Sequence, residues 1–286
     1  MTSGEFDALF REAVSAIDAG DGHALESLIA DHPELVRERL DAPGPWLREQ
    51  VGDALDGFFH RPWLLWFVAE DPVRNGRLPD NIAAIARAIV DAARHENVES
   101  LQEQLDSTLR LVSWSWIARE CGVQIALIDV LAEAGAALDG NPDHALVNGN
   151  RSAAAHLVER GARLTLGTAL CLERWGDVGR LAPAANDREK QFALVLAALN
   201  GKAEALRRIL ALGVELSAPS PDLFSHATAL HHAVWSGSLD AVRVLVDAGA
   251  DLTARDEAWS GTPLNWAEHS ENEEIVSYLK EREKTR

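Results

Sequence analysis

Positive charge is scarce in this sequence of 286 residues. There are 27 Lys and Arg against 45 Asp and Glu, so the formal net charge at pH 7 is −18. Proteins that bind nucleic acid or anionic membranes gain affinity by bringing cationic side chains to phosphate groups. The charge balance therefore argues against both roles, and we expect no nucleic-acid partner and no membrane partner.

Cysteine is rarer still, since Cys121 and Cys171 are the two in the sequence. They cannot form a disulfide framework, and no CxxC pair is present for zinc or redox chemistry. The sequence also lacks a Gly-rich phosphate-binding loop, a GxSxG motif and an HExxH motif. We therefore expect a cytoplasmic protein with no cofactor and no metal site.

Long apolar segments are missing as well. The longest apolar runs, Pro62 to Ala69 and Phe192 to Leu199, have eight residues each, whereas a membrane-spanning helix needs roughly 18 to 20. The N-terminal residues lack the basic start and apolar centre of a signal peptide. Yet 47% of all residues are hydrophobic, which is enough for a large buried core.

A repeat runs through the chain and predicts its fold. A small residue followed by Leu recurs at positions 145, 169, 193, 229 and 263, at spacings of 24 to 36 residues. Glycines at 135, 161, 213 and 249, with Asn186 in an equivalent place, are typical of left-handed helix C-caps. Each unit would be a helix, a tight turn, an antiparallel helix and a loop, which must stack on its neighbours. We predict an all-α solenoid of about eight helix pairs, degenerate at its N-terminal end.

The C-terminal repeats resemble a known family. Residues 228–233 read TALHHA, residues 249–251 read GAD, and the next repeat opens with GTPL at 261–264. These segments are similar to ankyrin repeats. The resemblance implies stacked helix pairs that usually present a binding surface, and it places His231 where an imidazole braces the neighbouring hairpin.

A wider resemblance covers residues 58–270, which are similar to a group of bacterial ankyrin-repeat proteins with no agreed activity. It rests on RPWLLW at 61–66, LPDNI at 78–82, ARECGVQ at 118–124 and LID at 127–129. The chain departs from that pattern at Trp114–Trp116, Ala126, Phe224 and Asn265. Both natural divergence and deliberate engineering would produce such departures.

Two regions and two insertions follow from the repeat pattern. Residues 1–104 hold the divergent repeats and residues 105–286 hold the ankyrin array. Prolines interrupt the pattern in residues 41–57 and 217–225, which we expect to be loops or flaps because proline breaks helices. Long loops of a solenoid usually lie on its functional face.

Tryptophan is abundant, with nine residues against one Tyr, which favours apolar contact over hydrogen bonding. In an ankyrin repeat the residues before each inter-helix turn face the concave surface. This placement predicts a Trp-rich, acidic groove for a protein partner, which the negative charge suggests is basic, or for a small apolar ligand. The candidate ligand-binding residues are Trp114, Trp116, Trp175, Asn200, Trp235 and His269. Core packing is the alternative for Trp63, Trp66 and Trp266.

A catalytic alternative rests on carboxylates beside this groove. An apolar surround would raise a carboxylate pKa toward neutrality and suit acid/base chemistry, with Glu120 or Glu173 as the acid/base and His226 or His232 as its proton partner. The chain would then be a cofactor-independent hydratase, lyase, isomerase or cyclase with a small apolar substrate. The competing reading is that the charges near Glu120 form structural ion pairs. His226, His231 and His232 lack a fourth zinc ligand, so we expect no metal there.

Overall fold

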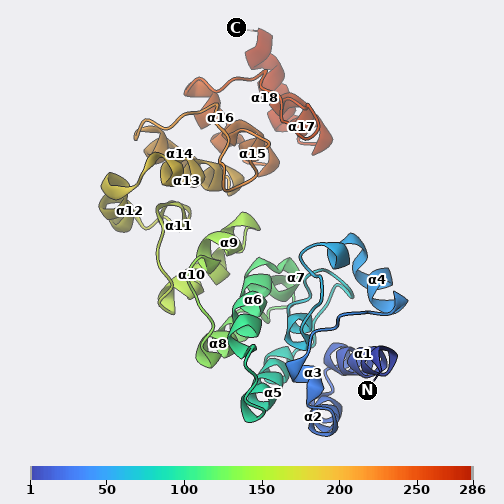
Figure 1. Cartoon of the computed structure of the whole chain (residues 1–286). Coiled ribbons are helices and arrows are strands. Elements are labelled where there is room, and N and C mark those ends of the chain that lie inside the picture. The colour runs from blue at the N-terminus through green and yellow to red at the C-terminus, as the bar shows by residue number, and fades with distance from the viewer. Residues whose placement is uncertain (1, 285–286) are drawn as a thin grey trace. The chain divides into compact units, whose positions relative to one another are not determined.

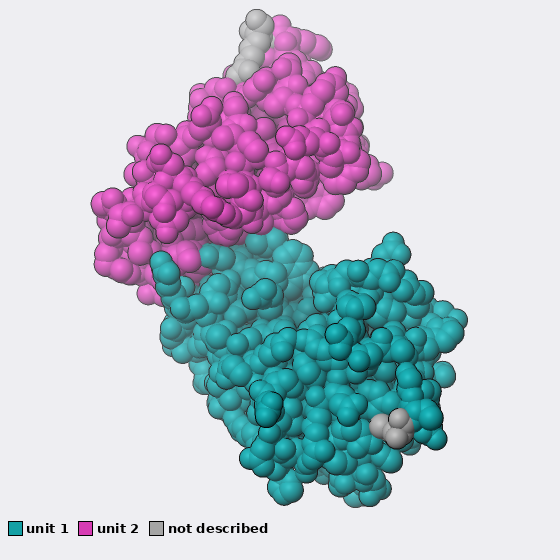
Figure 2. Space-filling model, viewed as in Figure 1, with its two compact units in different colours: residues 1–163 teal, residues 164–286 magenta. Residues whose placement is uncertain are grey.

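The computed structural model describes residues 2–284, and in them every regular element is a helix (Figure 1). The same residues contain one isolated bridge, between Ser220 and Leu223, and no strand. The all-α prediction is therefore confirmed. The chain divides into two compact units, residues 1–163 and residues 164–286 (Figure 2), and each is described by itself.

Unit 1 is built from two rows of helices that pack along each other. The first row contains α1, the 3-10 helix η2, α6 and α9, and the second contains α2, α5, α8 and α10. All six residues of η2 are buried, so this short segment fills the position of a full helix. The elements are α1 Ser3–Ala19, α2 Gly22–Asp31, α3 Glu34–Arg37, α4 Pro45–Val51, η1 Gly52–Asp56, η2 Leu64–Ala69, α5 Ile82–His95, α6 Leu101–Trp114, α7 Trp116–Glu120, α8 Gln124–Ala134, α9 Asn141–Val147 and α10 Arg151–Glu159.

Unit 2 repeats this arrangement. Helices α11, α13, α15 and α17 pack in one row, while α14, α16 and α18 pack in the other. Alanine and leucine residues of α13 and α15 are fully buried between neighbours. The elements are α11 Leu166–Cys171, α12 Trp175–Leu181, η3 Ala182–Ala184, α13 Asp187–Leu199, α14 Ala203–Leu210, α15 Ala229–Trp235, α16 Leu239–Asp247, α17 Pro263–His269 and α18 Glu273–Lys284.

Local sequence explains where these helices begin and end. Thr228 and Thr262 are the N-caps of α15 and α17, each in a capping box, which satisfies backbone N–H groups that have no partner in the helix. Gly249 follows α16 with φ of 97°, as its C-cap position predicts. Asn186 corrects our expectation, because its φ is −77° and its side chain caps the N-terminus of α13.

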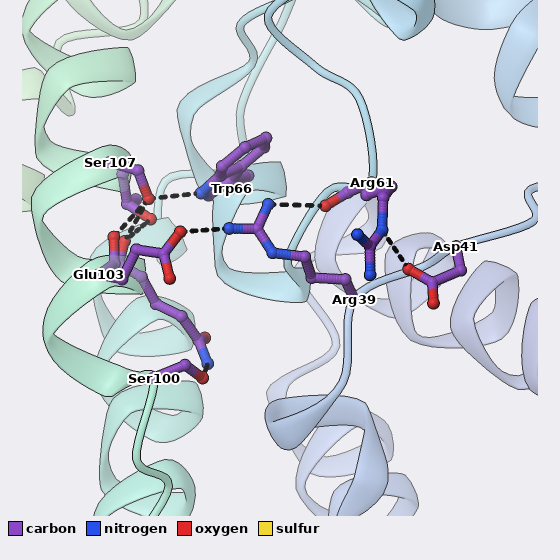
Figure 3. A network of polar contacts seen from close by, with 9 residues as sticks. Arg39, Asp41, Arg61, Trp66, Ser100, Glu103 and Ser107 are labelled. Atoms are coloured by element: carbon purple, nitrogen blue, oxygen red, sulfur yellow. Dashed lines mark hydrogen bonds and ion pairs between the residues drawn. The ribbon is translucent and has the colours of Figure 1, made fainter.

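The insertion at 41–57 is more regular than we expected. It contains α4, which begins at Pro45, where the missing proline N–H costs no hydrogen bond. The base of the insertion is held by Arg39, whose guanidinium donates to the Arg61 carbonyl oxygen and pairs with Glu103 of α6 (Figure 3). The same guanidinium lies 4.3 Å from the centre of the Trp63 ring. The expectation of a loop is therefore wrong for residues 45–56, which form α4 and the 3-10 helix η1.

The second insertion, 217–225, lies in the long loop between α14 and α15. The boundary expected at residue 104 falls inside α6, so it does not coincide with the boundary of the compact units. No helix among residues 2–284 is long and apolar enough to cross a membrane.

Candidate functional site

Unit 2 carries a cluster of aromatic rings, which we call the aromatic cluster. Its members come from α15, α17 and the loops that precede these two helices. Neighbouring ring centroids lie 5.2 to 6.3 Å apart, which is the range of favourable ring contacts. The members are Phe224, His226, His231, His232, Trp235, Trp259 and Trp266.

The aromatic cluster is partly open to solvent. Trp259 is 73% exposed, Trp235 is 59% exposed and Phe224 is 41% exposed. Isolated apolar side chains on a surface are common, but contiguous apolar patches mark sites of interaction. Because these three residues are linked through rings of one cluster, their exposure identifies this part of unit 2 as a candidate binding site.

Asp256 fixes the loop that carries Trp259. Its side chain is buried, and its carboxylate accepts hydrogen bonds from the backbone N–H of Trp259 at 2.7 Å and of Gly261 at 2.8 Å, and from the indole N–H of Trp266 at 3.0 Å. Burial would raise the Asp256 pKa, but the hydrogen bonds outweigh it and lower the pKa. A buried anion therefore holds the Trp266 indole and the backbone of Trp259 in place.

His231 braces the two loops as its sequence position predicts. Nε2 lies 3.1 Å from the Gly261 carbonyl oxygen, and Nδ1 accepts a hydrogen bond from the backbone N–H of Thr228. Nε2 is therefore the donor to Gly261. Burial lowers the pKa of this histidine, so it stays neutral and structural.

His232 differs from His231 because one of its ring nitrogens is unsatisfied. It is only 2% exposed, yet its Nε2 has no hydrogen-bond partner. The Phe224 and Ala227 backbone carbonyls favour a proton on the ring and so act to raise the His232 pKa. Since Nε2 has no partner, we place that proton on Nδ1, which leaves a lone pair on Nε2. Burial, helped by nearby His226 and His231, lowers the pKa to about 4. Nε2 is therefore an unused acceptor at neutral pH.

The candidate tryptophans of unit 1 lie in a different setting. Trp114, at the end of α6, stacks on His144 of α9 with ring centroids 4.9 Å apart. Trp116 begins α7 and is 41% exposed. Burial, with a smaller effect of the Arg110 charge, lowers the His144 pKa to about 4. Since these residues belong to unit 1 and Trp235 to unit 2, a single groove that joins them stays a prediction.

The end of α6 is held by amide side chains. Gln124 Nε2 donates to the Val112 carbonyl at 2.9 Å, and Asn150 Nδ2 donates to the Ser113 carbonyl at 2.8 Å. The Arg119 guanidinium in turn donates to Asn150 at 2.8 Å. These bonds satisfy carbonyls that the helix leaves free, so the polar residues near Glu120 support the backbone.

The two candidate catalytic carboxylates face solvent. The Glu120 side chain is 59% exposed and lies 3.9 Å from Arg119. The Glu173 side chain is 45% exposed and pairs with Lys202 at 3.0 Å. The two candidate histidines do come together, since the His226 and His232 rings are 6.3 Å apart. Glu120 belongs to unit 1, whereas both histidines belong to unit 2.

The remaining predicted ligand-binding residues lie on unit 2. Trp175 stacks under the Arg208 guanidinium at 4.4 Å. Asn200 donates to the Leu196 carbonyl at 2.8 Å, and His269 is exposed at the end of α17. Of the six predicted ligand-binding residues, Trp235 is a member of the aromatic cluster.

Sequence reasoning missed three residues of this site: Asp256, Trp259 and the binding role of Phe224. A signal was present for two of them, because an Asp before a short Gly-ending loop often accepts its backbone N–H groups. Such an Asp would have marked the loop, and with it Trp259, as ordered. Nothing in the sequence indicated that Phe224 would cover His232.

The packing of helix pairs in both units defines an all-α repeat solenoid. The family model described as ankyrin repeats in three copies matches residues 144–256 of this chain. The match includes α15 and Asp256, while Trp259 and Trp266 follow it. No curated protein matches the chain. Among residues 2–284, no group of His, Cys, Asp and Glu could hold a metal ion.

Proposed function

We propose that this chain is a protein-binding repeat protein and that its partner docks on the aromatic cluster. Ankyrin repeats generally mediate protein–protein interaction, which supports the proposal at the level of the family. The observation that carries it is the exposure of Trp235, Trp259 and Phe224 within one ordered cluster. Tryptophan is the residue type most enriched among those that dominate binding energy at interfaces.

The charge near this site favours a basic partner. Residues 226–272 contain seven Asp and Glu against two Arg. Arg243 pairs with Asp240, and Arg255 donates to the Ser260 carbonyl at 2.6 Å. An acidic surface accelerates association with a cationic partner and disfavours acidic ones. Both cysteines are free thiols, which suits an encounter in the reducing cytoplasm.

Selection from a random peptide library displayed on phage, with the full chain as bait, tests this proposal. Selected peptides would be synthesised and their affinities measured by calorimetry for the parent and for the Trp235→Ser/Trp259→Ser double variant. We expect the double variant to bind at least about tenfold more weakly, because the contact area of two indoles is lost.

Phe58→Ser is the matched control, since Phe58 of unit 1 is 59% exposed, as Trp235 is. The control should bind as the parent does, and circular dichroism should show that all three proteins are equally helical. Equal peptide affinity of the parent and the double variant would overturn the proposal. A small apolar ligand is the alternative occupant, and it would compete with the peptides.

The acid/base enzyme stays a second hypothesis without a structural observation in its favour. It requires a carboxylate in an apolar surround, whereas the Glu120 and Glu173 side chains are 59% and 45% exposed. A turnover assay on the Glu120→Gln and Glu173→Gln variants would test it once a substrate is known.

A further inference from the structure

The His232 ring, whose Nε2 has no hydrogen-bond partner, packs against an aromatic ring. Phe224 packs on His232 with ring centroids 5.7 Å apart and planes inclined by 35°. The Phe224 ring is 41% exposed, while His232 beneath it is 2% exposed. A buried acceptor without a partner is costly, because the group has lost its hydrogen bond to water. Phe224 therefore packs on a ring that carries an unsatisfied polar atom, and its own ring offers that atom no hydrogen bond.

The backbone of Phe224 is strained as well. Its φ is +47°, in the left-handed region that bulky side chains rarely adopt. Strained residues of this kind are concentrated at ligand clamps and switch regions. The residue belongs to the long loop between α14 and α15, which holds no helix of its own. Displacing Phe224 would relieve the strain and open His232 at the same time.

The groups around His232 define which ligand group could take the place of the Phe224 ring. A lone pair on Nε2 requires a hydrogen-bond donor. The flanking rings of Trp266 and His226, with centroids 6.1 and 6.3 Å from that of His232, provide aromatic faces, and aromatic faces attract cations. The excess of carboxylates in residues 226–272 favours positive charge over a neutral donor.

We infer that the place of the Phe224 ring is a binding site for a lysine or arginine side chain of the partner, whose N–H donates to Nε2 of His232. This inference rests on the proposed function and specifies what the aromatic cluster recognises. Phe224 acts as a cover that the incoming side chain displaces. The low pKa of His232 keeps Nε2 available as an acceptor throughout the neutral range.

Small probes test this site without the partner. The full chain, labelled with ¹⁵N-histidine, would be titrated with butylammonium, butylguanidinium, butyltrimethylammonium and 1-pentanol while the His232 Nε2 resonance is followed by NMR. We expect saturable shifts with butylammonium or butylguanidinium. Butyltrimethylammonium, a cation without an N–H, and pentanol, a weak neutral donor, should each bind at least about tenfold more weakly.

Two variants, each with a matched control, distinguish a loss of recognition from a loss of folding. His232→Phe keeps an aromatic ring and removes the acceptor, so butylammonium affinity, followed in this variant through the resonances of neighbouring His226, should fall by about tenfold. His144→Phe is its control, because that half-buried histidine of unit 1 has its pKa lowered to the same value of about 4. Phe224→Gly removes the cover and the strain and should bind butylammonium several-fold more tightly. Asn97→Gly, at another positive φ of 50°, should not change the affinity.

Several outcomes would overturn the inference. No shift of the resonance with any probe would mean that a water molecule satisfies Nε2. Equal binding of butyltrimethylammonium would exclude the hydrogen bond, and equal binding of pentanol would exclude the charge. If selected peptides bind through Trp235 and Trp259 without a Lys or Arg, the inference fails while the proposed function stands. If butylammonium binds and no peptide does, the proposed function fails by itself.

Discussion

Asp256 illustrates how much of the candidate site depends on one side chain. Its carboxylate accepts hydrogen bonds from the backbone N–H groups of Ala258, Trp259 and Gly261 and from the Trp266 indole. Asp256→Ala should lower the free energy of unfolding by about 2 to 3 kcal/mol, because buried donors lose their acceptor. Urea unfolding measures the change. Asp240→Ala, which removes an exposed i,i+3 partner of Arg243, should cost less than about 0.5 kcal/mol. Equal losses of unfolding free energy in the Asp256→Ala and Asp240→Ala variants would contradict the role of Asp256 in holding this loop.

His232 makes stability depend on pH. The unfolded chain takes up a proton at this residue below about pH 6.5, whereas the folded chain keeps the ring neutral down to about pH 4. Its effect on stability is therefore absent above pH 6.5 and grows as the pH falls toward 4. At pH 5 the cost is about 2 kcal/mol. The titratable groups that act on His232, which are His226 and His231, remain in place in a His232→Phe variant.

Unfolding at pH 7.5 and pH 5.0 should therefore show a loss of stability that is about 2 kcal/mol smaller for His232→Phe than for the parent. His144, whose pKa is also lowered to about 4, destabilises the parent and the variant equally as the pH falls, so its effect cancels in the comparison. An identical loss in the parent and the variant would show that His232 is not a buried neutral group.

At the scale of elements, each helix pair depends on the next one for burial. Val242, Leu245 and Val246 of α16 and Ile275 and Leu279 of α18 are buried, and α16 packs on α18. Removal of residues 261–286 should expose the apolar face of α16 and reduce the solubility and the cooperativity of unfolding, because terminal repeats cap solenoids. Size-exclusion chromatography and thermal unfolding would record both changes.

The control for that truncation is Glu274→Ser, which changes an exposed position of α18 and should leave both properties unchanged. Ile275→Ser, one residue further along, should lower stability because it places a hydroxyl in the interface between pairs. A soluble, cooperatively folding truncation would show that α17 and α18 are not required as a cap.

The net charge of −18 belongs to the whole molecule. If the partner is basic, long-range attraction should accelerate association, and added salt should screen it within roughly 10 Å at 0.1 M. We expect the association rate of a basic selected peptide to fall about tenfold between low salt and 0.5 M salt, measured by stopped-flow fluorescence. The dissociation rate should change little, since contacts with the aromatic cluster are apolar. A rate independent of salt would remove the electrostatic argument for a basic partner.

The repeat pattern alone predicted the helical class, because helices that cannot bury their apolar faces alone must stack. The resemblance of residues 228–233 to an ankyrin repeat predicted the role of His231, since that motif places an imidazole at the brace. The repeat pattern failed at Asn186 and at Pro45, where the same residue types serve at the start of a helix as well as at its end or in a turn. Short local signals of this kind do not specify whether a helix begins or ends at the residue, and the surrounding packing determines it.

Tertiary structure decided which of the nine tryptophans gather into one site. Trp235, Trp259 and Trp266 meet because α15, α17 and the loop held by Asp256 are adjacent in space. The repeat spacing predicts that α15 lies beside α17, but it does not specify the loop conformation that brings Trp259 to them. The unused acceptor of His232 has the same origin, since its burial depends on Phe224 from a loop of irregular length. The sequence by itself determined that the chain forms stacked helix pairs, through periodic apolar residues and local caps. Long-range contacts determined which side chains remained exposed, because burial depends on neighbours distant in the chain.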